Sequence, residues 1–261
     1  MELQIKQHNG FKYVDEGQGE TLLLLHGLFG ALSNWQGVVD EFARTHRVVI
    51  PMLPIYEMPL TRAGISGLVE FVEDFTKAMQ LTQPAVVLGN SLGGHVALVY
   101  ALRNPQRVKQ MVLTGSSGLF EDSMGGSFPR RGDYQYVQER VAYTFYDPKV
   151  ATKELVDEVF NVTNSNAKCL RIISIARSAQ RHNLTKDLGK IKAPTLLIWG
   201  LNDTITPPVV AHEFHRLLPH SELHFLDHCG HAPMMERPQA FNRLLQRFLA
   251  PAVEAAPAAQ A

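Results

Sequence analysis

A serine flanked by glycines stands at the junction of two patterned segments. Residues 89–93 read Gly-Asn-Ser-Leu-Gly and place Ser91 at the centre of a G-x-S-x-G motif. The apolar run 85–88 before it is typical of a short strand, and residues 92–103 after it are typical of a helix. In such a strand–turn–helix connection the central hydroxyl is raised above the sheet edge, and the glycines avoid Cβ clashes. The motif therefore predicts a nucleophilic Ser91.

A base and an acid should accompany this serine. A serine hydroxyl is a poor nucleophile at neutral pH, so it needs a base within reach and a third group that orients the base. The expected pair is a histidine and a carboxylate, on loops that follow later strands. Asp203 lies directly after the apolar run 195–199 and fits the acid. His231 follows the expected last strand and fits the base.

Both assignments have alternatives. A lone aspartate in a loop often only binds turn amides, so Asp203 has a structural interpretation too. His228 lies three residues before His231 and nearer to the end of the strand. Gly230 gives the chain freedom to turn His231 inward, and we therefore expect His231 rather than His228 to be the base.

Backbone amides are expected to stabilise the oxyanion that forms when a carbonyl is attacked. One donor is the amide of Leu92, which follows the nucleophile at the N-terminus of a helix. The second should come from the loop after the apolar run 22–25, which reads His-Gly-Leu-Phe-Gly. The Leu28 amide is the first choice and the Phe29 amide the second, while His26 is expected to brace the loop.

Composition favours a single large domain and excludes several classes of partner. The chain has 261 residues, of which 45% are hydrophobic and 19% charged, as in a soluble globular enzyme. Its 25 basic and 25 acidic residues leave no positive surplus for nucleic acid or an anionic membrane. Two cysteines make no disulfide framework, and neither a signal peptide nor an apolar run of roughly 20 residues is found. We expect a cytoplasmic protein, monomeric or homodimeric, with a small-molecule substrate.

Short apolar runs alternate with helix-like segments, which predicts an α/β fold with a mostly parallel, eight-stranded sheet flanked by helices. The expected strands are 2–6, 11–15, 21–25, 48–52, 85–88, 109–114, 195–199 and 222–226. The expected helices are 33–43, 65–80, 92–103, 207–218 and 238–249.

A long segment interrupts this alternation. About 80 residues separate the strand that ends at 114 from the one that begins at 195, too many for a simple connection. Apolar residues recur there at helical spacing. We therefore expect a helical lid at 118–190, inserted into a core made of 1–117 and 191–249. The Ala/Pro-rich segment 250–261 is expected to be a disordered tail.

Four short motifs, in this order at the ends of expected strands, resemble those of the α/β-hydrolase superfamily: His26-Gly27, Gly89-x-Ser91-x-Gly93, Gly200-x-x-Asp203 and Gly230-His231. The resemblance extends from about residue 10 to 249, with the lid the least matched part. It implies a triad of Ser91 as nucleophile, Asp203 as acid and His231 as base, with no metal and no organic cofactor.

The expected function is that of a carboxylesterase-like serine hydrolase acting on a small, largely apolar ester or related acyl substrate. The tetrapeptide at 90–93 is also similar to the Asn-Ser-Met-Gly of meta-cleavage-product hydrolases, which break a C–C bond. Against that alternative, Ala232 stands after the histidine where those enzymes usually have tryptophan, and the oxyanion loop differs. A non-enzymatic ligand receptor on the same scaffold is a third possibility.

Other candidates are interpreted as structural. Segment 52–59 lacks the Asp-x-x-Gly-x-Gly loop of many superfamily members. Its Tyr56 or Glu57 could reach the site, but both are expected to face solvent. His95 is expected to be a packed helix histidine. The lid arginines are expected to be solvated, although one of them could bind a substrate carboxylate: Arg171, Arg177 and Arg181. Two histidines on an expected helix, His212 and His215, have a spacing that can bind zinc but lack a third ligand.

Overall fold

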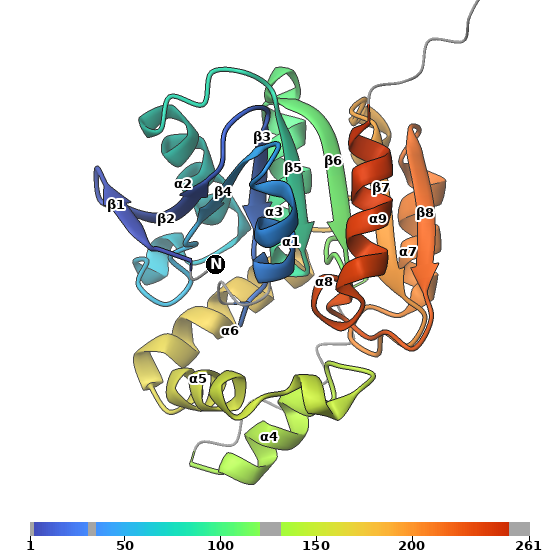
Figure 1. Ribbon diagram of the computed structural model, residues 1–261. Helices are drawn as coiled ribbons and strands as arrows, with labels where there is room; N and C mark the ends of the chain where they lie inside the picture. The colour runs from blue at the N-terminus through green and yellow to red at the C-terminus, as the bar shows by residue number, and fades with distance from the viewer. Residues whose placement is uncertain (1–2, 31–34, 121–131, 251–261) are drawn as a thin grey trace, which may run out of the picture.

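An eight-stranded sheet forms the centre of the molecule (Figure 1). The structure is a computed structural model and describes residues 3–30, 35–120 and 132–250. The strands are β1 (Lys6–His8), β2 (Phe11–Glu16), β3 (Thr21–Leu25), β4 (Arg47–Pro51), β5 (Ala85–Asn90), β6 (Val108–Thr114), β7 (Thr195–Gly200) and β8 (Ser221–Leu226). Their order is β1-β2-β4-β3-β5-β6-β7-β8. The pairs β1–β2 and β2–β4 are antiparallel, and all others are parallel. The predicted fold class is therefore confirmed.

Helices cover both faces of this sheet. They are α1 (Gln36–Phe42), α2 (Ile65–Ala78), α3 (Leu92–Arg103), α7 (Pro208–Leu217), α8 (Pro233–Glu236) and α9 (Pro238–Leu249). One apolar cluster joins α1, α8 and α9 to one face, and a second joins α2, α3 and α7 to the other. Two layers of helix therefore enclose the strands that carry the candidate site.

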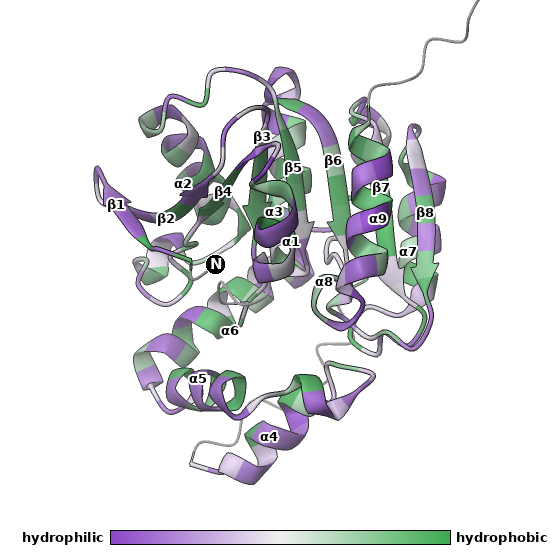
Figure 2. Cartoon of the chain, in the orientation of Figure 1, coloured by the Kyte–Doolittle hydropathy of each residue, from purple (hydrophilic) through white to green (hydrophobic). Residues whose placement is uncertain are grey.

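Alternation along the central strands explains this burial. In β3, Leu22 and Leu24 enter the cluster of α1 and α9, whereas Leu23 and Leu25 enter the cluster of α2 and α3. A strand that is apolar on both faces is typical of a parallel sheet covered on both sides. Figure 2 shows the central strands as hydrophobic and the exposed edge strand β1 as largely hydrophilic.

The first strand lies further along the chain than predicted. It was expected at 2–6, but β1 comprises Lys6–His8 and pairs with β2 so that His8 faces Phe11. Asn9 and Gly10 between them have φ values of 49° and 81°, the conformation of a two-residue hairpin turn. Because that turn fixes the register, the paired residues must flank it directly.

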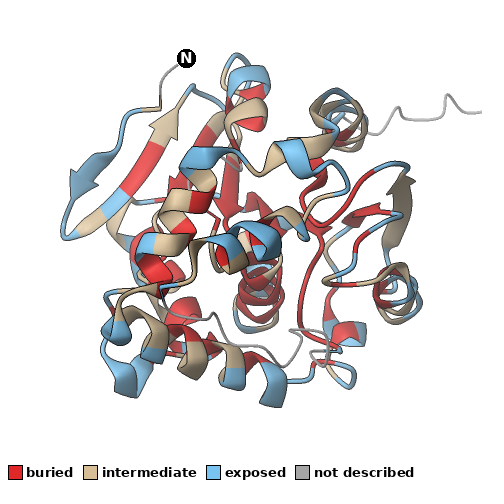
Figure 3. Cartoon of the chain, turned by 90° about the horizontal axis from the view of Figure 1, so that it is seen from below, coloured by how far each residue is buried: buried red, intermediate tan, exposed pale blue. Residues whose placement is uncertain are grey.

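Among the described residues, three α-helices lie between β6 and β7 in the chain: α4 (Tyr134–Ala142), α5 (Lys153–Thr163) and α6 (Asn166–Arg181). Each begins at a capping side chain, from Asp133, Thr152 and Ser165, that accepts a backbone N–H of the first turn. In Figure 1 they lie below the sheet, on the side toward which β8 points. Figure 3 views the molecule from that side, with buried residues gathered on the central strands.

The inserted helices form two parts with different attachments. On α6, Ile175 belongs to the cluster of α2 and α3, Ser174 Oγ donates to Ala63 O, and Ser178 Oγ accepts from Ile65 N. By contrast, α4 and α5 bury an apolar cluster of their own, centred on four valines. Thus α6 is fixed to the core, and α4 and α5 share an apolar cluster of their own.

Several expectations about the chain are not tested by the structure and stay predictions. Residues 121–131 of the expected lid, 251–261 of the expected tail and 31–34, where the helix expected at 33–43 begins, lie outside the described residues. The division into core, lid and tail is untested, as are the cytoplasmic location and the oligomeric state. In the part of the chain that the structure describes, no helix is both long and apolar enough to cross a bilayer.

Truncation of Ile175 tests whether α6 belongs to the core. The side chain of Ile175 is fully buried, so Ile175→Ala should lower the free energy of unfolding by about 2–5 kcal/mol. Leu170→Ala is the matched control, because Leu170 lies on the same helix and is 53% exposed. Urea denaturation measures both. Equal, small losses would contradict this attachment of α6.

Candidate active site

The turn between β5 and α3 places Ser91 at the edge of the sheet in a strained conformation. Ser91 has φ 54° and ψ −120°, a region that non-glycine residues rarely adopt. A Cβ at Gly93 would lie 2.1 Å from Leu25 O, and one at Gly89 would lie 2.5 Å from Gly93 O. The two glycines are therefore required by close packing of backbone around the turn.

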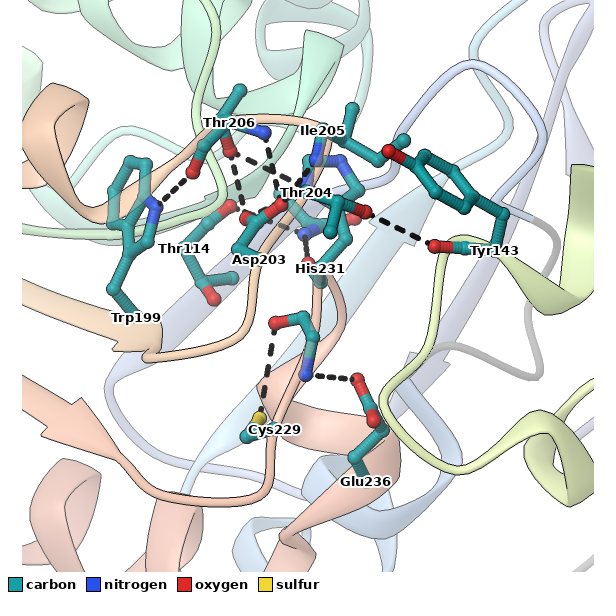
Figure 4. Close-up of polar contacts among 12 residues, drawn as sticks. Thr114, Tyr143, Trp199, Asp203, Thr204, Ile205, Thr206, Cys229, His231 and Glu236 are labelled. Atoms are coloured by element: carbon teal, nitrogen blue, oxygen red, sulfur yellow. Dashed lines mark hydrogen bonds and ion pairs between the residues drawn. The ribbon is translucent and has the colours of Figure 1, made fainter.

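The loop after β7 carries Asp203 in a buried position. Its Oδ1 accepts hydrogen bonds from Ile205 N at 2.8 Å and Thr206 N at 2.9 Å. Its Oδ2 accepts from Thr206 Oγ1 at 2.8 Å and from His231 Nδ1 at 2.9 Å (Figure 4). Asp203 thus binds turn amides with one oxygen and orients a histidine with the other, so both interpretations of this residue apply at once.

The loop after β7 that carries Asp203 (the acid loop) and the loop after β8 that carries His231 (the base loop) are held together by their backbones. Asn202 N donates to Cys229 O at 2.9 Å, and a Cβ at Gly200 would lie 2.1 Å from Gly230 O. Trp199 Nε1 donates to Thr206 O at 2.8 Å and fixes the far end of the acid loop (Figure 4). The glycine that ends β7 is therefore required by contact with the base loop.

Of the two candidate histidines, the structure brings His231 to Asp203. His231 is buried, its backbone N donates to Thr144 O at 3.0 Å, and its O accepts from Asn90 Nδ2 at 3.2 Å. Its Nε2 is buried without a hydrogen-bond partner among the described residues. His228 is exposed, and its Nδ1 lies 3.1 Å from Asp227 Oδ2.

The serine and the histidine are neighbours through their backbones. Asn90, the residue before Ser91, donates from Nδ2 to both Thr114 O and His231 O. Ser91 N also donates to Thr114 O at 3.1 Å. No hydrogen bond joins Ser91 Oγ to His231 within the described ranges, and such contacts are often long before substrate binds. Their pairing in catalysis therefore stays a prediction.

The expected oxyanion donors lie on two ordered backbone segments. Leu92 is the first residue of α3, where helix N–H groups are free to bind an anion. Gly27 O accepts from Gly30 N at 3.1 Å and lies 2.9 Å from His26 Nδ1. Because a trans peptide points its N–H away from its C=O, these contacts fix the direction of the Leu28 N–H.

His26 braces the oxyanion loop from within the core. Its Nε2 accepts from Leu53 N at 3.0 Å, which leaves the proton on Nδ1 to be donated to Gly27 O. Burial lowers the pKa of His26, and this favours the neutral ring that the two contacts require.

The prediction that Tyr56 faces solvent is wrong. Its hydroxyl donates to Leu28 O at 2.7 Å, and burial raises its pKa, so the hydroxyl stays protonated and available as a donor. Glu57 beside it is exposed as expected. Tyr56 and Leu28 are 28 positions apart, and nothing in the local sequence signals that contact. Segment 52–59 therefore supports the oxyanion loop.

The remaining candidates have structural partners. Arg171 is half-buried and donates to Met58 O and Ala167 O, so it is less solvated than predicted, whereas Arg177 and Arg181 are exposed. His95 is fully buried, and its Nε2 lies 3.1 Å from His182 Nδ1.

The helix histidines form no metal site. His215 Nδ1 lies 3.0 Å from Ser221 Oγ, and the His212 ring packs on Phe225. Across 3–30, 35–120 and 132–250, no group of three or more His, Cys, Asp or Glu residues is arranged to hold a metal ion.

Comparison with known proteins gives consistent relatives over almost the whole chain. The sequence profile of the Alpha/beta hydrolase family matches residues 22–244. The solved structure of MGS-MChE2, an alpha/beta hydrolase enzyme from a sediment metagenome of the lagoon of Mar Chica, Morocco, is 39% identical with a TM-score of 0.78. The match covers 94% of this chain and 97% of that one.

Two curated relatives of similar identity differ in their named substrates. The 2-hydroxy-6-oxo-6-phenylhexa-2,4-dienoate hydrolase of Burkholderia cepacia is 29% identical over 260 residues, covering 90% of each chain. The pimeloyl-acyl-carrier-protein methyl ester esterase of Nitrosomonas europaea is 28% identical over 249 residues, covering 86% of this chain and 94% of its own.

Reactivity toward a fluorophosphonate tests the assignment of Ser91 as nucleophile and His231 as base. We expect the probe to label the wild-type protein at Ser91 and to leave Ser91→Ala unlabelled, because only an activated serine reacts. His231→Ala should lose nearly all labelling, and the control His228→Ala should retain it. Mass spectrometry of the labelled peptide gives the site. Labelling of Ser91→Ala, or equal losses for the two histidines, would refute these assignments.

Removal of the Tyr56 hydroxyl tests its support of the oxyanion loop. Tyr56→Phe leaves Leu28 O without this donor, and we expect the rate of fluorophosphonate labelling to fall about tenfold. The control is Tyr134→Phe on α4, which loses a single hydroxyl contact to Asp157 instead. Stopped labelling reactions measure both rates. An unchanged rate in Tyr56→Phe would show that the loop holds its conformation without this contact.

Proposed function

Because this chain belongs to the α/β hydrolase family, we propose that it is a serine hydrolase that cleaves a small, largely apolar carboxylic ester through an acyl-enzyme. One observation carries the proposal: buried Asp203 orients buried His231 at 2.9 Å, beside the strained turn at Ser91. The candidate oxyanion amides are that of Leu28, in the loop after β3, and that of Leu92, the first residue of α3.

In the proposed reaction Ser91 Oγ attacks the ester carbonyl while His231 Nε2 takes its proton. Asp203 Oδ2 holds the proton on His231 Nδ1, so Nε2 is the nitrogen left to act as base. The Leu28 and Leu92 amides bind the tetrahedral oxyanion, a contribution of about 3–4 kcal/mol for one donor in a comparable site. His231 then protonates the leaving alcohol, and water attacks the acyl-enzyme with His231 again as base.

We propose α4 and α5 as the lid of this site. Phe29, in the oxyanion loop, packs against the apolar cluster that α4 and α5 share. An apolar wall at this position suits a substrate with an apolar acyl or alcohol group.

Cleavage of a C–C bond is the second candidate, supported by Asn90 and by relatives such as the Burkholderia cepacia dienoate hydrolase. A dienoate substrate carries a carboxylate, for which an arginine is the best partner. Arg171 already donates to two backbone carbonyls, and Arg177 is exposed. Because Arg171 already has two backbone partners, it is poorly placed to bind a substrate carboxylate, and this favours the ester over the dienoate.

A substrate panel with Asp203→Asn tests the proposed reaction. We expect the wild type to hydrolyse p-nitrophenyl esters, and Asp203→Asn to lower kcat by roughly 10³- to 10⁴-fold, because the amide no longer holds the productive imidazole tautomer. Ser91→Ala provides the background rate. Release of p-nitrophenolate measures the ester reaction, and loss of dienoate absorbance measures the C–C reaction.

The two candidate reactions give opposite results in this panel. Turnover of the dienoate without any ester turnover would replace the ester by the C–C substrate. Turnover of neither, with wild-type labelling at Ser91 intact, would place the substrate outside both classes.

A further inference from the structure

A carboxylate outside the proposed triad joins the base loop to the inserted helices. Glu236, at the end of α8, accepts a hydrogen bond from Gly230 N at 2.8 Å and one from Tyr146 N at 2.7 Å. Gly230 directly precedes His231, and Tyr146 follows the end of α4. Figure 4 shows Glu236 with its carboxylate turned toward the backbone of the base loop. One side chain therefore connects two segments that are distant in the sequence.

The two segments also touch each other directly. His231 N donates to Thr144 O at 3.0 Å. A Cβ at Gly230 would lie 2.8 Å from Thr144 O and 2.9 Å from Tyr146 N, closer than real Cβ atoms approach other atoms. Gly230 does not have a positive φ, so a glycine is required there by this close approach and not by an unusual turn. The base loop is thus pressed against residues 144–146.

The acid loop also contacts the segment at residues 143–146. Thr204 Oγ1 donates to Tyr143 O at 3.1 Å, in the loop that carries Asp203 (Figure 4). Residues 143–146 therefore contact both loops of the candidate site through their backbone, and Glu236 is the side chain that fastens the arrangement.

We propose that Glu236 is a positioning residue for His231, which rests on the function proposed above. By holding the Gly230 and Tyr146 amides, it fixes the backbone at 230–231, so that the imidazole keeps its bond to Asp203 and presents Nε2 to the serine. It acts through His231 and does not touch the substrate.

The surroundings of Glu236 suit this role. Burial raises the pKa of its carboxyl group, and backbone amides of four residues oppose that rise: Tyr146, Gly230, Ala232 and Asp147. Hydrogen bonds from amides to a carboxylate are stronger than those between neutral groups. A glutamine side chain can replace only one of the two hydrogen bonds from Gly230 N and Tyr146 N, because its NH₂ group would face the other backbone N–H.

Replacement by glutamine tests the proposal at nearly constant size. Glu236→Gln should lower kcat for the ester by about 10- to 100-fold, because a small displacement of the base is costly to the reaction. KM should change little, since Glu236 does not contact the substrate. The control is Glu41→Gln, which removes an exposed carboxylate of α1 and should leave both constants unchanged.

Gly230→Ala disturbs the same contact from the other side. Its new Cβ would press on Thr144 O and Tyr146 N, so we expect a similar loss of kcat. Because both substitutions break one contact, the double variant should lose less than the product of the two single losses. If Glu236→Gln does not fold, the loss of kcat in Gly230→Ala alone tests the role of this contact.

A spectroscopic readout separates positioning from simple stabilisation. We expect the proton between His231 Nδ1 and Asp203 Oδ2 to give a downfield ¹H NMR resonance. This resonance should shift or broaden in Glu236→Gln and stay unchanged in Glu41→Gln. A lower unfolding temperature with unchanged kcat and unchanged resonance would overturn the proposal. If the wild type hydrolyses no ester, the proposed function fails, and the resonance alone still decides whether Glu236 positions His231.

Discussion

The hydrogen bond from His231 Nδ1 to Asp203 Oδ2 is the interaction on which the candidate site depends. The side chains are 7% and 0% exposed, so neither could exchange this partner for water, and loss of either would leave a buried polar group unsatisfied. The parallel pairing of β7 with β8, which places Gly200 opposite Leu226, brings the acid and base loops together at one edge. Close backbone contacts of Gly200 and Gly230 then set the separation of those loops.

The inserted helices belong to this arrangement and do more than cover it. The backbone of residues 143–146 accepts hydrogen bonds from Thr204 Oγ1 of the acid loop and from His231 N of the base loop, while α6 is fixed to the core at Ala63 and Ile65. Tyr56 and His26 hold the oxyanion loop through Leu28 O and Gly27 O. The base loop and the oxyanion loop are thus each held by hydrogen bonds to backbone groups, and Asn90 joins the serine turn to the base loop.

The sequence predicts the parts of the site that have a local signature. Ser91 stands in a glycine-flanked turn. Asp203 and His231 each follow an apolar run, three residues after Gly200 and directly after Gly230. The strand near the N-terminus lies later than expected because the Asn9–Gly10 turn, and not the apolar pattern before it, fixes the register of the hairpin.

The supporting contacts have no such signature. Tyr56 reaches across 28 residues to a carbonyl, and residues 143–146 act through their backbone, whose contacts do not depend on side-chain identity. Glu236 resembles any helix glutamate in the sequence; only the fold shows that it faces two amides. Tertiary packing, and not local pattern, decides these roles.

A crystal structure of the protein after reaction with a fluorophosphonate tests the assignment of the nucleophile, base and oxyanion donors together. We expect phosphorus bonded to Ser91 Oγ, with one phosphoryl oxygen about 2.7–3.1 Å from the Leu28 and Leu92 amides and His231 Nε2 turned toward the adduct. An adduct on another residue, or a phosphoryl oxygen directed away from both amides with His231 separated from Asp203, would contradict this assignment.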